Sequence, residues 1–246
     1  MKKHRRLLSA LLVVIGVIAI CAGGVMLYAS DYYSPSEDAL AALATTETVT
    51  VRRTDDGLVF LPAEPAAGFI FYPGGKVEHT AYAPLMRALA EEGILCILTD
   101  MPLRLAVLDM DAAAGLSAQY PQVTRWSIGG HSLGGAMAAS YAAENPDEFD
   151  GLVLLAAYST AKLPEEGMAV ASIYGTEDKV LAMDKYEQYR TNLPVHTVET
   201  VIPGGNHAQF GCYGAQSGDG AAAITAQEQI EATVAACLGV LTGIEN

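Results

Sequence analysis

The sequence predicts an α/β domain built on a mostly parallel, eight-stranded sheet with helices on both faces, preceded by one N-terminal transmembrane helix. A long uncharged run lies close to the N-terminus, and from residue 47 onward short apolar segments typical of strands alternate with longer segments typical of helices. Most strand segments are continuously apolar, as expected when helices cover both faces of a sheet. The composition, 51% hydrophobic and 17% charged, fits such a packed body.

Residues 1–30 are expected to form a basic flank and a membrane anchor. Four basic residues within positions 2–6 precede an uncharged run of 23 residues, 7–29. As a helix rising about 1.5 Å per residue, this run reaches about 34 Å, enough to cross a hydrocarbon core of about 30 Å. The alternative is a cleaved signal peptide, whose apolar region is normally about 7–15 residues long. The positive flank predicts a cytoplasmic N-terminus and a single-pass protein of the cell membrane with its body outside, or a secreted body if the segment is cleaved.

Residues 31–46 are expected to form a short stem, and residues 47–246 a single domain. A hairpin of residues 47–53 and 57–61 opens this domain, with its turn at Gly57. The pattern predicts further strands at residues 68–72, 93–98, 123–128, 151–156, 168–174 and 195–202, and helices at residues 82–92, 105–119, 133–145, 183–192 and 225–241. Only 11 residues, Ala157–Gly167, separate two of these strands. That interval is too short for a helical lid, so we expect an open site without a cap domain.

The charge of the chain argues against a nucleic-acid partner. The net charge is −14, and the four basic residues near the N-terminus precede every acidic one. The remainder carries 10 basic and 28 acidic residues, a balance of −18. Because phosphate binding needs a basic face, such a body repels polyanions. A small-molecule substrate and a membrane are therefore the expected partners, and no oligomeric state is predicted.

The sequence places a candidate nucleophile, Ser132, in a G-x-S-x-G motif. Gly130, His131, Ser132, Leu133 and Gly134 follow the strand predicted at 123–128 and precede an alanine-rich helix. A sharp strand-to-helix turn exposes the serine hydroxyl at the carboxyl edge of the sheet, and the flanking glycines avoid collisions. The Leu133 N–H and the positive end of the helix then lie where an oxyanion would form. The alternative is a glycine-rich turn that holds a structural serine.

With this motif in place, the chain resembles the α/β-hydrolase superfamily. It looks most like a bacterial subfamily whose members commonly carry an N-terminal membrane span. The resemblance rests on the segments YPGGKVE at 72–78, TDMPLRLAVLD at 99–109, GGHSLGG at 129–135, YGTEDKV at 174–180 and GGNHAQFGCYG at 204–214. It implies a nucleophile, an acid and a histidine in that chain order. The dienelactone hydrolases share the fold but use a cysteine nucleophile, so Ser132 separates this chain from them.

The base and the acid follow from position and from this resemblance. His207 follows the last predicted strand, at the carboxyl edge where ligands bind in such sheets. The acid should follow the preceding strand, where Glu177 and Asp178 are the candidates. In the resembling family a G-x-x-D pattern places the acid at Asp178. It would hold His207 in the working tautomer and stabilise the imidazolium. A solvated loop histidine and a solvated carboxylate are the alternatives.

The second oxyanion donor is expected in the loop after the strand at 68–72. The backbone N–H of Gly75 or of Lys76 would join that of Leu133, and the sequence leaves the choice between them open.

The sequence shows no ligand cluster at zinc spacing and no phosphate-cradling loop, so neither a metal nor an organic cofactor is expected. Outside the cytoplasm, Cys212 and Cys237 form a possible disulfide, with two unpaired thiols as the alternative.

Together these residues predict a serine hydrolase that cleaves carboxylic esters of small to modest size. Ser132, His207 and Asp178 would form its catalytic triad, and the reaction would pass through an acyl-enzyme. The same triad could serve an acyltransferase, a thioesterase or an amidase. A different class is a catalytically idle binding module on the same fold.

Overall fold

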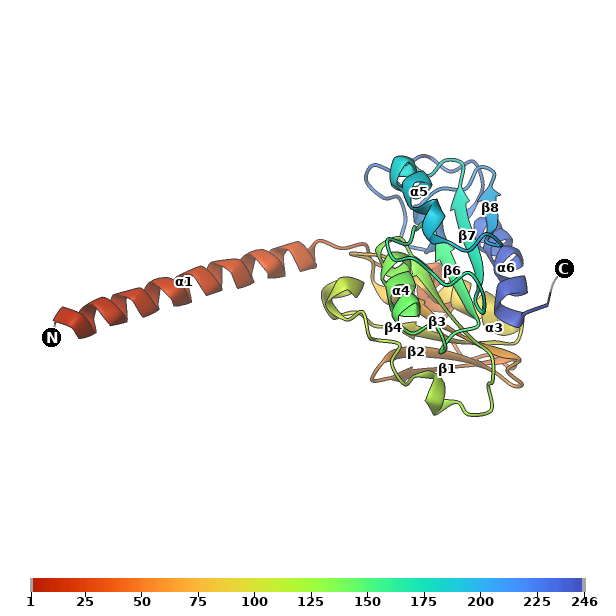
Figure 1. The fold of residues 1–246 in the computed structure, drawn as a ribbon, viewed down its shortest axis with the longest axis horizontal. Coiled ribbons are helices and arrows are strands. Elements are labelled where there is room, and N and C mark those ends of the chain that lie inside the picture. The colour runs from red at the N-terminus through yellow and green to blue at the C-terminus, as the bar shows by residue number, and fades with distance from the viewer. Residues whose placement is uncertain (1, 245–246) are drawn as a thin grey trace. The chain divides into compact units, whose positions relative to one another are not determined.

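The computed structural model describes residues 2–244, and their side chains from Leu11 onward. By its internal contacts the chain divides into two units, residues 1–32 and residues 33–246. The first unit is one long helix, α1 (Lys2–Ser30). The second contains all the strands and the remaining helices (Figure 1).

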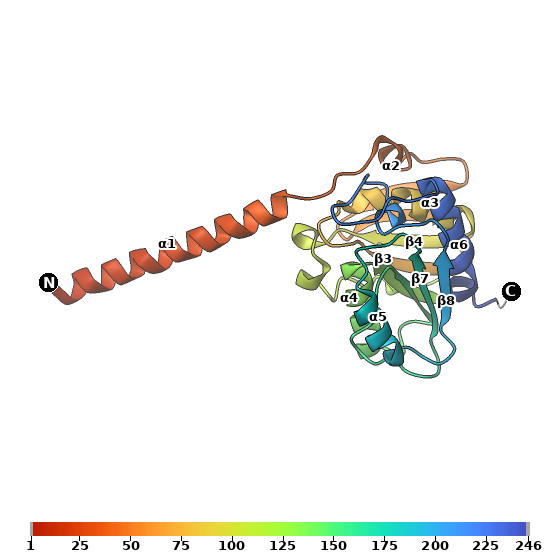
Figure 2. The ribbon, with the colours of Figure 1, turned by 90° about the horizontal axis from the view of Figure 1, so that it is seen from above.

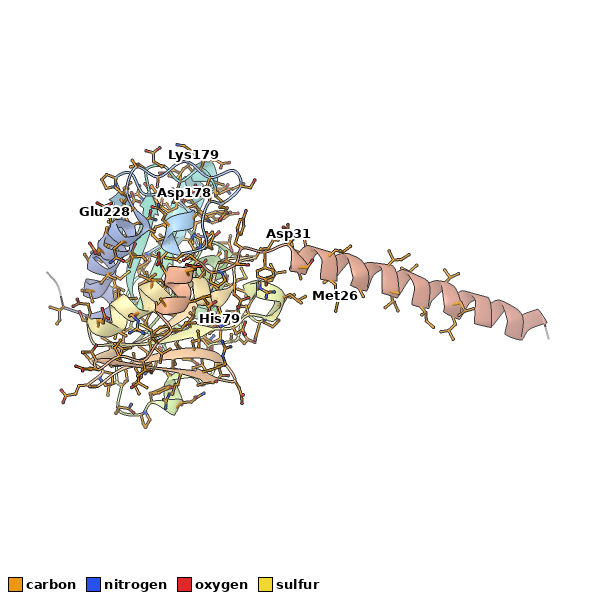
Figure 3. All side chains as sticks on the ribbon, turned by 180° about the vertical axis from the view of Figure 1, so that it is seen from behind. Met26, Asp31, His79, Asp178, Lys179 and Glu228 are labelled. Carbon is orange, nitrogen blue, oxygen red and sulfur yellow. The ribbon has the colours of Figure 1, made fainter. Side chains whose placement is uncertain are left out.

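From Leu11 onward, helix α1 is apolar on all sides. The segment Leu11–Ser30 has a mean hydropathy of 2.6, and the side chains from Leu11 to Tyr28 are exposed. Met26, for example, projects freely from the helix (Figure 3). A helix that is hydrophobic all round belongs in a membrane or in a core. This helix is long enough to cross a bilayer, and a signal sequence meets the same description.

The second unit is built on one eight-stranded sheet with the order β1-β2-β4-β3-β5-β6-β7-β8. The strands are β1 (Val49–Thr54), β2 (Gly57–Pro62), β3 (Ala67–Tyr72), β4 (Ile94–Thr99), β5 (Trp126–His131), β6 (Gly151–Leu155), β7 (Ala169–Gly175) and β8 (Val198–Ile202). Strands β3 to β8 run parallel to one another, whereas β2 pairs antiparallel with both β1 and β4. The prediction of a mostly parallel, eight-stranded sheet is therefore confirmed.

Helices cover both faces of this sheet. Helices α3 (Ala83–Glu91) and α6 (Ala226–Thr242) lie on one face, and α4 (Leu133–Glu144) and α5 (Met183–Tyr189) lie on the other (Figure 2). The interior divides accordingly into two apolar clusters, one under α3 and α6 and one under α4. Every residue of β3, β4, β5 and β6 is buried, which explains the apolar runs of β3, β4 and β6.

The helix predicted at residues 105–119 is wrong. The structure has three short 3-10 turns instead, Pro102–Arg104, Ala106–Leu108 and Ser117–Gln119. The buried Tyr72 hydroxyl donates to the carbonyl of Met110 and accepts from the N–H of Ala113, both at 2.8 Å. A side chain from β3 thus satisfies backbone groups that a helix would otherwise pair, and Gly115 turns the chain at φ 72°.

Residues 33–46, which make up most of the expected stem, contact the body of the domain. Helix α2 (Glu37–Ala41) begins at Ser36, whose hydroxyl accepts from the N–H of Ala39. Ala39 is fully buried, and the Arg87 guanidinium of α3 donates to the carbonyls of Ala42 and Ala44. These contacts make the segment part of the folded unit.

Between β6 and β7 the chain forms a loop without a helix, as the short interval predicted. Strand β5 begins at Trp126, three residues later than the pattern suggested, because the N–H of Val123 instead closes a turn on the carbonyl of Tyr120. Because no helix lies between β6 and β7, the carboxyl edge of the sheet carries no helical lid in this region.

Of the two alternatives for Cys212 and Cys237, the structure has the unpaired thiols, and all four cysteines are free. Cys237 lies on the inner face of α6, where burial raises its pKa to about 12. Burial also raises the pKa of Cys96 in β4, and the nearby Cys237 adds to this rise. Cys212 lies in a loop near Asp38, with its N–H donating to the carbonyl of Ala81. The two cysteines therefore lie in different environments, Cys237 in the core and Cys212 in a partly exposed loop.

Replacing Thr225 should measure how firmly α6 is fixed at its start. The Thr225 hydroxyl accepts from the N–H of Glu228 at 3.2 Å, and the Glu228 carboxylate accepts from the N–H of Thr225 at 2.8 Å, a capping box. Thr225→Ala removes the hydroxyl and should lower the free energy of unfolding by about 1 kcal/mol. Urea denaturation measures the change, with Thr225→Ser as the control that keeps the cap. Equal loss in both variants would contradict this account.

Candidate active site

Four loops that follow parallel strands bring the predicted site residues together. Gly75 follows β3, Ser132 follows β5, Asp178 follows β7 and His207 follows β8. Because the carboxyl ends of parallel strands meet at one edge of the sheet, these residues collect there despite their separation in sequence. Asp178 and Lys179 lie together at this edge, in the loop after β7 (Figure 3).

Ser132 occupies a strained turn between β5 and α4. Its backbone adopts φ 53° and ψ −120°, an unfavourable conformation for a residue with a side chain, and its N–H donates to the carbonyl of Leu155 at 2.9 Å. A Cβ on Gly130 would lie 2.5 Å from the Tyr72 carbonyl oxygen, and a Cβ on Gly134 would lie 2.2 Å from the same atom. The two glycines therefore let β3 and α4 approach closely enough to fix the turn.

The structure distinguishes the two candidates for the second oxyanion donor. The Lys76 N–H donates to the carbonyl of Arg104 at 2.9 Å, and the Gly74 N–H donates to the Tyr82 hydroxyl at 3.0 Å. Within the described residues, the N–H groups of Gly75 and Leu133 have no such partner. A Cβ on Gly75 would lie 3.0 Å from a side-chain carbon of Leu133, so the two residues are neighbours. This arrangement favours Gly75 over Lys76.

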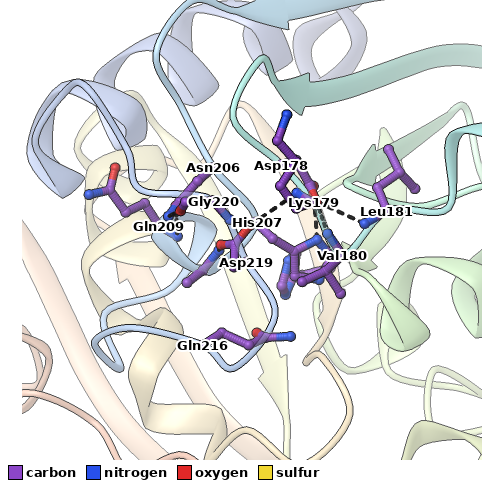
Figure 4. A network of polar contacts seen from close by, with 12 residues as sticks. Asp178, Lys179, Val180, Leu181, Asn206, His207, Gln209, Gln216, Asp219 and Gly220 are labelled. Atoms are coloured by element: carbon purple, nitrogen blue, oxygen red, sulfur yellow. Dashed lines mark hydrogen bonds and ion pairs between the residues drawn. The ribbon is translucent and has the colours of Figure 1, made fainter.

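Asp178 and His207 form a buried pair. The Nδ1 atom of His207 lies 2.8 Å from Oδ2 of Asp178, and their side chains are 2% and 1% exposed (Figure 4). The other oxygen, Oδ1, accepts from the N–H groups of Val180 and Leu181, each at 2.8 Å. Both carboxylate oxygens are thus fixed, and the Nε2 atom of His207 remains for another partner. Glu177 instead accepts from the Thr176 hydroxyl.

Two buried or half-buried polar residues support this pair, and the sequence analysis missed both. The carboxylate of Asp219 accepts from the N–H of Lys179 at 3.2 Å and from the N–H of Ala208 at 2.9 Å, joining the residues that follow Asp178 and His207 (Figure 4). Gln229 of α6, fully buried, accepts from the N–H of Asn206 and donates to its carbonyl. A glutamine on the apolar face of a helix was the available sequence signal.

His131 and Tyr82 form a second buried pair beside the first. The Tyr82 hydroxyl and Nδ1 of His131 are 2.8 Å apart, and the rings of His131 and His207 lie 4.5 Å from each other. Burial, and then the charge on His207, lower the pKa of His131 well below its usual value. Burial likewise raises the pKa of Tyr82. Both side chains therefore remain neutral near pH 7.

Ser132 and His207 line the same cavity, which has a volume of about 340 Å³. Its other walls are mainly aliphatic: Leu133, Ala136, Met137, Ala156, Ala157, Tyr158, Thr160, Val180, Leu181 and Ala182. A larger hollow of about 950 Å³ lies beside β7, β8 and α6 but contains neither residue. The reactive groups therefore belong to the smaller cavity. Among the side chains that the structure describes, residues 11–244, no group of three or more His, Cys, Asp or Glu could hold a metal.

Several solved structures share the fold at low sequence identity. Carboxyl esterase 2 from Tuber melanosporum aligns with a TM-score of 0.57 at 11% identity, covering 86% of this chain and 91% of that one. A dienelactone hydrolase candidate from Klebsiella pneumoniae gives 0.56 at 18% identity, covering 80% of this chain and 100% of that one. TT1662 from Thermus thermophilus gives 0.58 at 16% identity, covering 78% and 98%.

The family assignment comes from the sequence itself. No curated protein matches this chain. The sequence profile described as the alpha/beta hydrolase family, however, matches residues 68–231, from β3 into α6. This match spans more than half of the chain and includes Ser132, Asp178 and His207. The protein therefore belongs to the alpha/beta hydrolase family.

Proposed function

We propose that this hydrolase cleaves carboxylic esters of small to modest size through an acyl-enzyme on Ser132. The observation that carries the proposal is one cavity lined by both Ser132 and His207, with His207 fixed from behind by Asp178 at 2.8 Å. A serine hydroxyl is a weak nucleophile unless a base takes its proton and a third group orients that base. These three residues fit those roles.

In the proposed mechanism, Ser132 Oγ attacks the ester carbonyl while His207 Nε2 takes the hydroxyl proton. The tetrahedral oxyanion accepts hydrogen bonds from the N–H groups of Leu133 and Gly75. Its collapse breaks the ester bond, and His207 returns the proton to the leaving alcohol. Water then attacks the acyl-enzyme with His207 again as the base, releasing the acid and restoring Ser132.

Asp178 orients His207 and stabilises the imidazolium that forms in each step. Its two backbone hydrogen bonds, from Val180 and Leu181, hold the carboxylate in place. Those donors also favour the ionised form. His131, although close, is paired with Tyr82 and kept neutral by burial, so it does not compete as a base.

The likeness to a fungal carboxyl esterase and the serine nucleophile both favour ester hydrolysis. The Klebsiella protein is described as a dienelactone hydrolase candidate. In dienelactone hydrolases the nucleophile is cysteine, whereas this chain has Ser132. The aliphatic cavity and the absence of a helix between β6 and β7 favour a compact, neutral ester over a long lipid chain.

We further propose that α1 remains as an uncleaved anchor. The proposal is supported by its exposed apolar surface and by the four basic residues at positions 2–6. Positive charge is retained on the cytoplasmic side, so the catalytic domain would lie outside the cytoplasm.

Removing the nucleophile tests the reaction class. Wild-type protein should react with a fluorophosphonate probe and hydrolyse p-nitrophenyl butyrate, whereas Ser132→Ala should lose labelling and at least about 10³-fold in kcat, as triad variants do. Ser140→Ala, which removes a half-buried hydroxyl from the same helix, is the matched control. Labelling without ester turnover would point to an acyltransferase, a thioesterase or an amidase. Neither signal would point to a binding module.

Neutralising the acid tests the orientation of the base. Asp178→Asn keeps the shape but favours the wrong histidine tautomer, so kcat should fall by roughly 10³–10⁴ while the fold survives. Steady-state kinetics and thermal unfolding measure the two effects. Glu177→Gln, one residue away, should retain wild-type kcat, and an equal loss in both variants would reverse the assignment of the acid.

The cavity predicts a limit on acyl length. Carbons that extend beyond the cavity of about 340 Å³ gain no apolar contact, while ordering the longer chain costs entropy, so kcat/KM should be higher for p-nitrophenyl butyrate than for laurate. Ala136→Leu narrows the cavity and should shift preference toward acetate, whereas Met137→Ala enlarges it. A preference for laurate in the wild type would contradict this use of the cavity.

A further inference from the structure

The segment Tyr33–Ser36, which we call the strap, binds the loop that carries Gly75. The Tyr33 N–H donates to the carbonyl of Lys76 at 2.8 Å, and the Glu78 N–H donates to the carbonyl of Tyr33 at 3.0 Å. Together they form a short parallel bridge between Tyr33 and Val77. The strap therefore pairs, strand-like, with the three residues that follow Gly75.

The strap also binds the loop of residues 211–222, which follows His207. The Ser217 N–H donates to the Tyr33 hydroxyl at 3.1 Å, and the rings of Tyr33 and Tyr213 lie 5.4 Å apart. The Ser36 N–H donates to the carbonyl of Cys212 at 2.8 Å. One four-residue segment thus joins two loops that arise from opposite halves of the sheet.

Both loops lead directly to the reacting groups. Gly75, the favoured oxyanion donor, precedes Lys76. On the other side, Ser217 lies two residues before Asp219, whose carboxylate binds the N–H groups of Lys179 and Ala208 (Figure 4). A shift of the 211–222 loop would therefore move the backbone beside both the acid and the base.

Aromatic contacts provide a second path from the strap to His207. The ring of Tyr213, which is tilted against that of Tyr33, lies 6.4 Å from the ring of Tyr82. Tyr82 in turn binds His131 and accepts from the N–H of Gly74, and His131 contacts His207. Tyr82 thus connects the oxyanion loop with the base through side chains that are buried.

These loops need such support because little regular structure holds them. The 211–222 loop contains no helix or strand, and Gly214 and Gly218 have positive φ values of 81° and 84°. Lys76 in the other loop has φ 60° despite its side chain. Ordering a residue costs conformational entropy, so loops of this kind stay fixed only where contacts hold them. A displacement of about 1 Å in a reacting group lowers rates by about 10²-fold.

We propose that Tyr33 is a positioning residue, and that the strap holds the oxyanion loop and the 211–222 loop in the geometry required for catalysis. This inference rests on the proposed function of Ser132, His207 and Asp178. It gives the residues directly after α1 a role beyond that of a linker, because Tyr33 lies three positions after the last residue of that helix.

The test uses the full chain in detergent micelles. Tyr33→Phe removes the acceptor of the Ser217 N–H and keeps the ring, whereas Tyr33→Ala removes both. Tyr141→Phe, which deletes a hydroxyl that donates to Glu148 in another part of the fold, is the control. Each variant is compared with the wild type by kcat and KM for p-nitrophenyl butyrate, by thermal unfolding and by amide hydrogen exchange.

For Tyr33→Ala we expect faster exchange at residues 74–78 and 211–218, and a fall in kcat of about tenfold with KM within about twofold. Tyr33→Phe should accelerate exchange at Ser217 and lower kcat less, and Tyr141→Phe should match the wild type in both. Unchanged exchange in the two loops overturns the proposal. So does a lower melting temperature with unchanged kcat, because that result shows a purely structural role.

Failure of the proposed function gives a different result. If the wild type neither labels with the fluorophosphonate probe nor hydrolyses ester, the serine hydrolase assignment is wrong. Exchange then decides the strap by itself. Faster exchange in both loops of Tyr33→Ala supports the strap, and unchanged exchange overturns it.

Discussion

The close approach of α4 to the end of β3 is the constraint on which the rest of the site depends. Two glycines permit it, since a Cβ on Gly130 or on Gly134 would lie within 2.5 Å of the Tyr72 carbonyl oxygen. The same contact bends the chain so sharply that Ser132 adopts a positive φ. It also places Leu133 beside Gly75, so one packing contact positions Ser132 and the two N–H groups that we propose as oxyanion donors. Strain of this kind persists only where surrounding structure determines the conformation.

Polar side chains hold the loops of the site in place by hydrogen bonding to their backbone groups. Asp219 and Gln229 satisfy backbone groups on either side of His207, and Tyr82 satisfies Gly74. Each donor or acceptor would be costly to bury unpaired, so these contacts define single loop conformations. No helix between β6 and β7 covers the site, so the positions of its loops depend on these hydrogen bonds. The strap at Tyr33 extends the network to the segment that follows the apolar helix.

Much of the fold could be predicted from local sequence patterns. Continuous apolar runs identified most of the parallel strands because helices cover both faces of the sheet. The glycines around Ser132 identified the turn because close backbone approach excludes side chains at those positions. The order of strand, nucleophile, acid and histidine then placed Asp178 and His207 in loops at one edge. The structure brings these three residues into one site, and their chemical roles remain for the proposed experiments.

What the sequence by itself determined was therefore the fold class, the apolar N-terminal helix and the residues at the sheet edge, all of which depend on local periodicity or on strand direction. Tertiary structure alone decided the remainder. Hydrogen bonds to the Tyr72 hydroxyl hold the backbone of residues 110–113 in a non-helical conformation, where a helix over 105–119 was expected. Cys237 is buried in the interior, whereas Cys212 is partly exposed. The tertiary structure also pairs the N–H of Lys76 with the carbonyl of Arg104, which is why we propose Gly75 as the donor. Each of these outcomes depends on partners distant in the chain, and local patterns carry no information about such contacts.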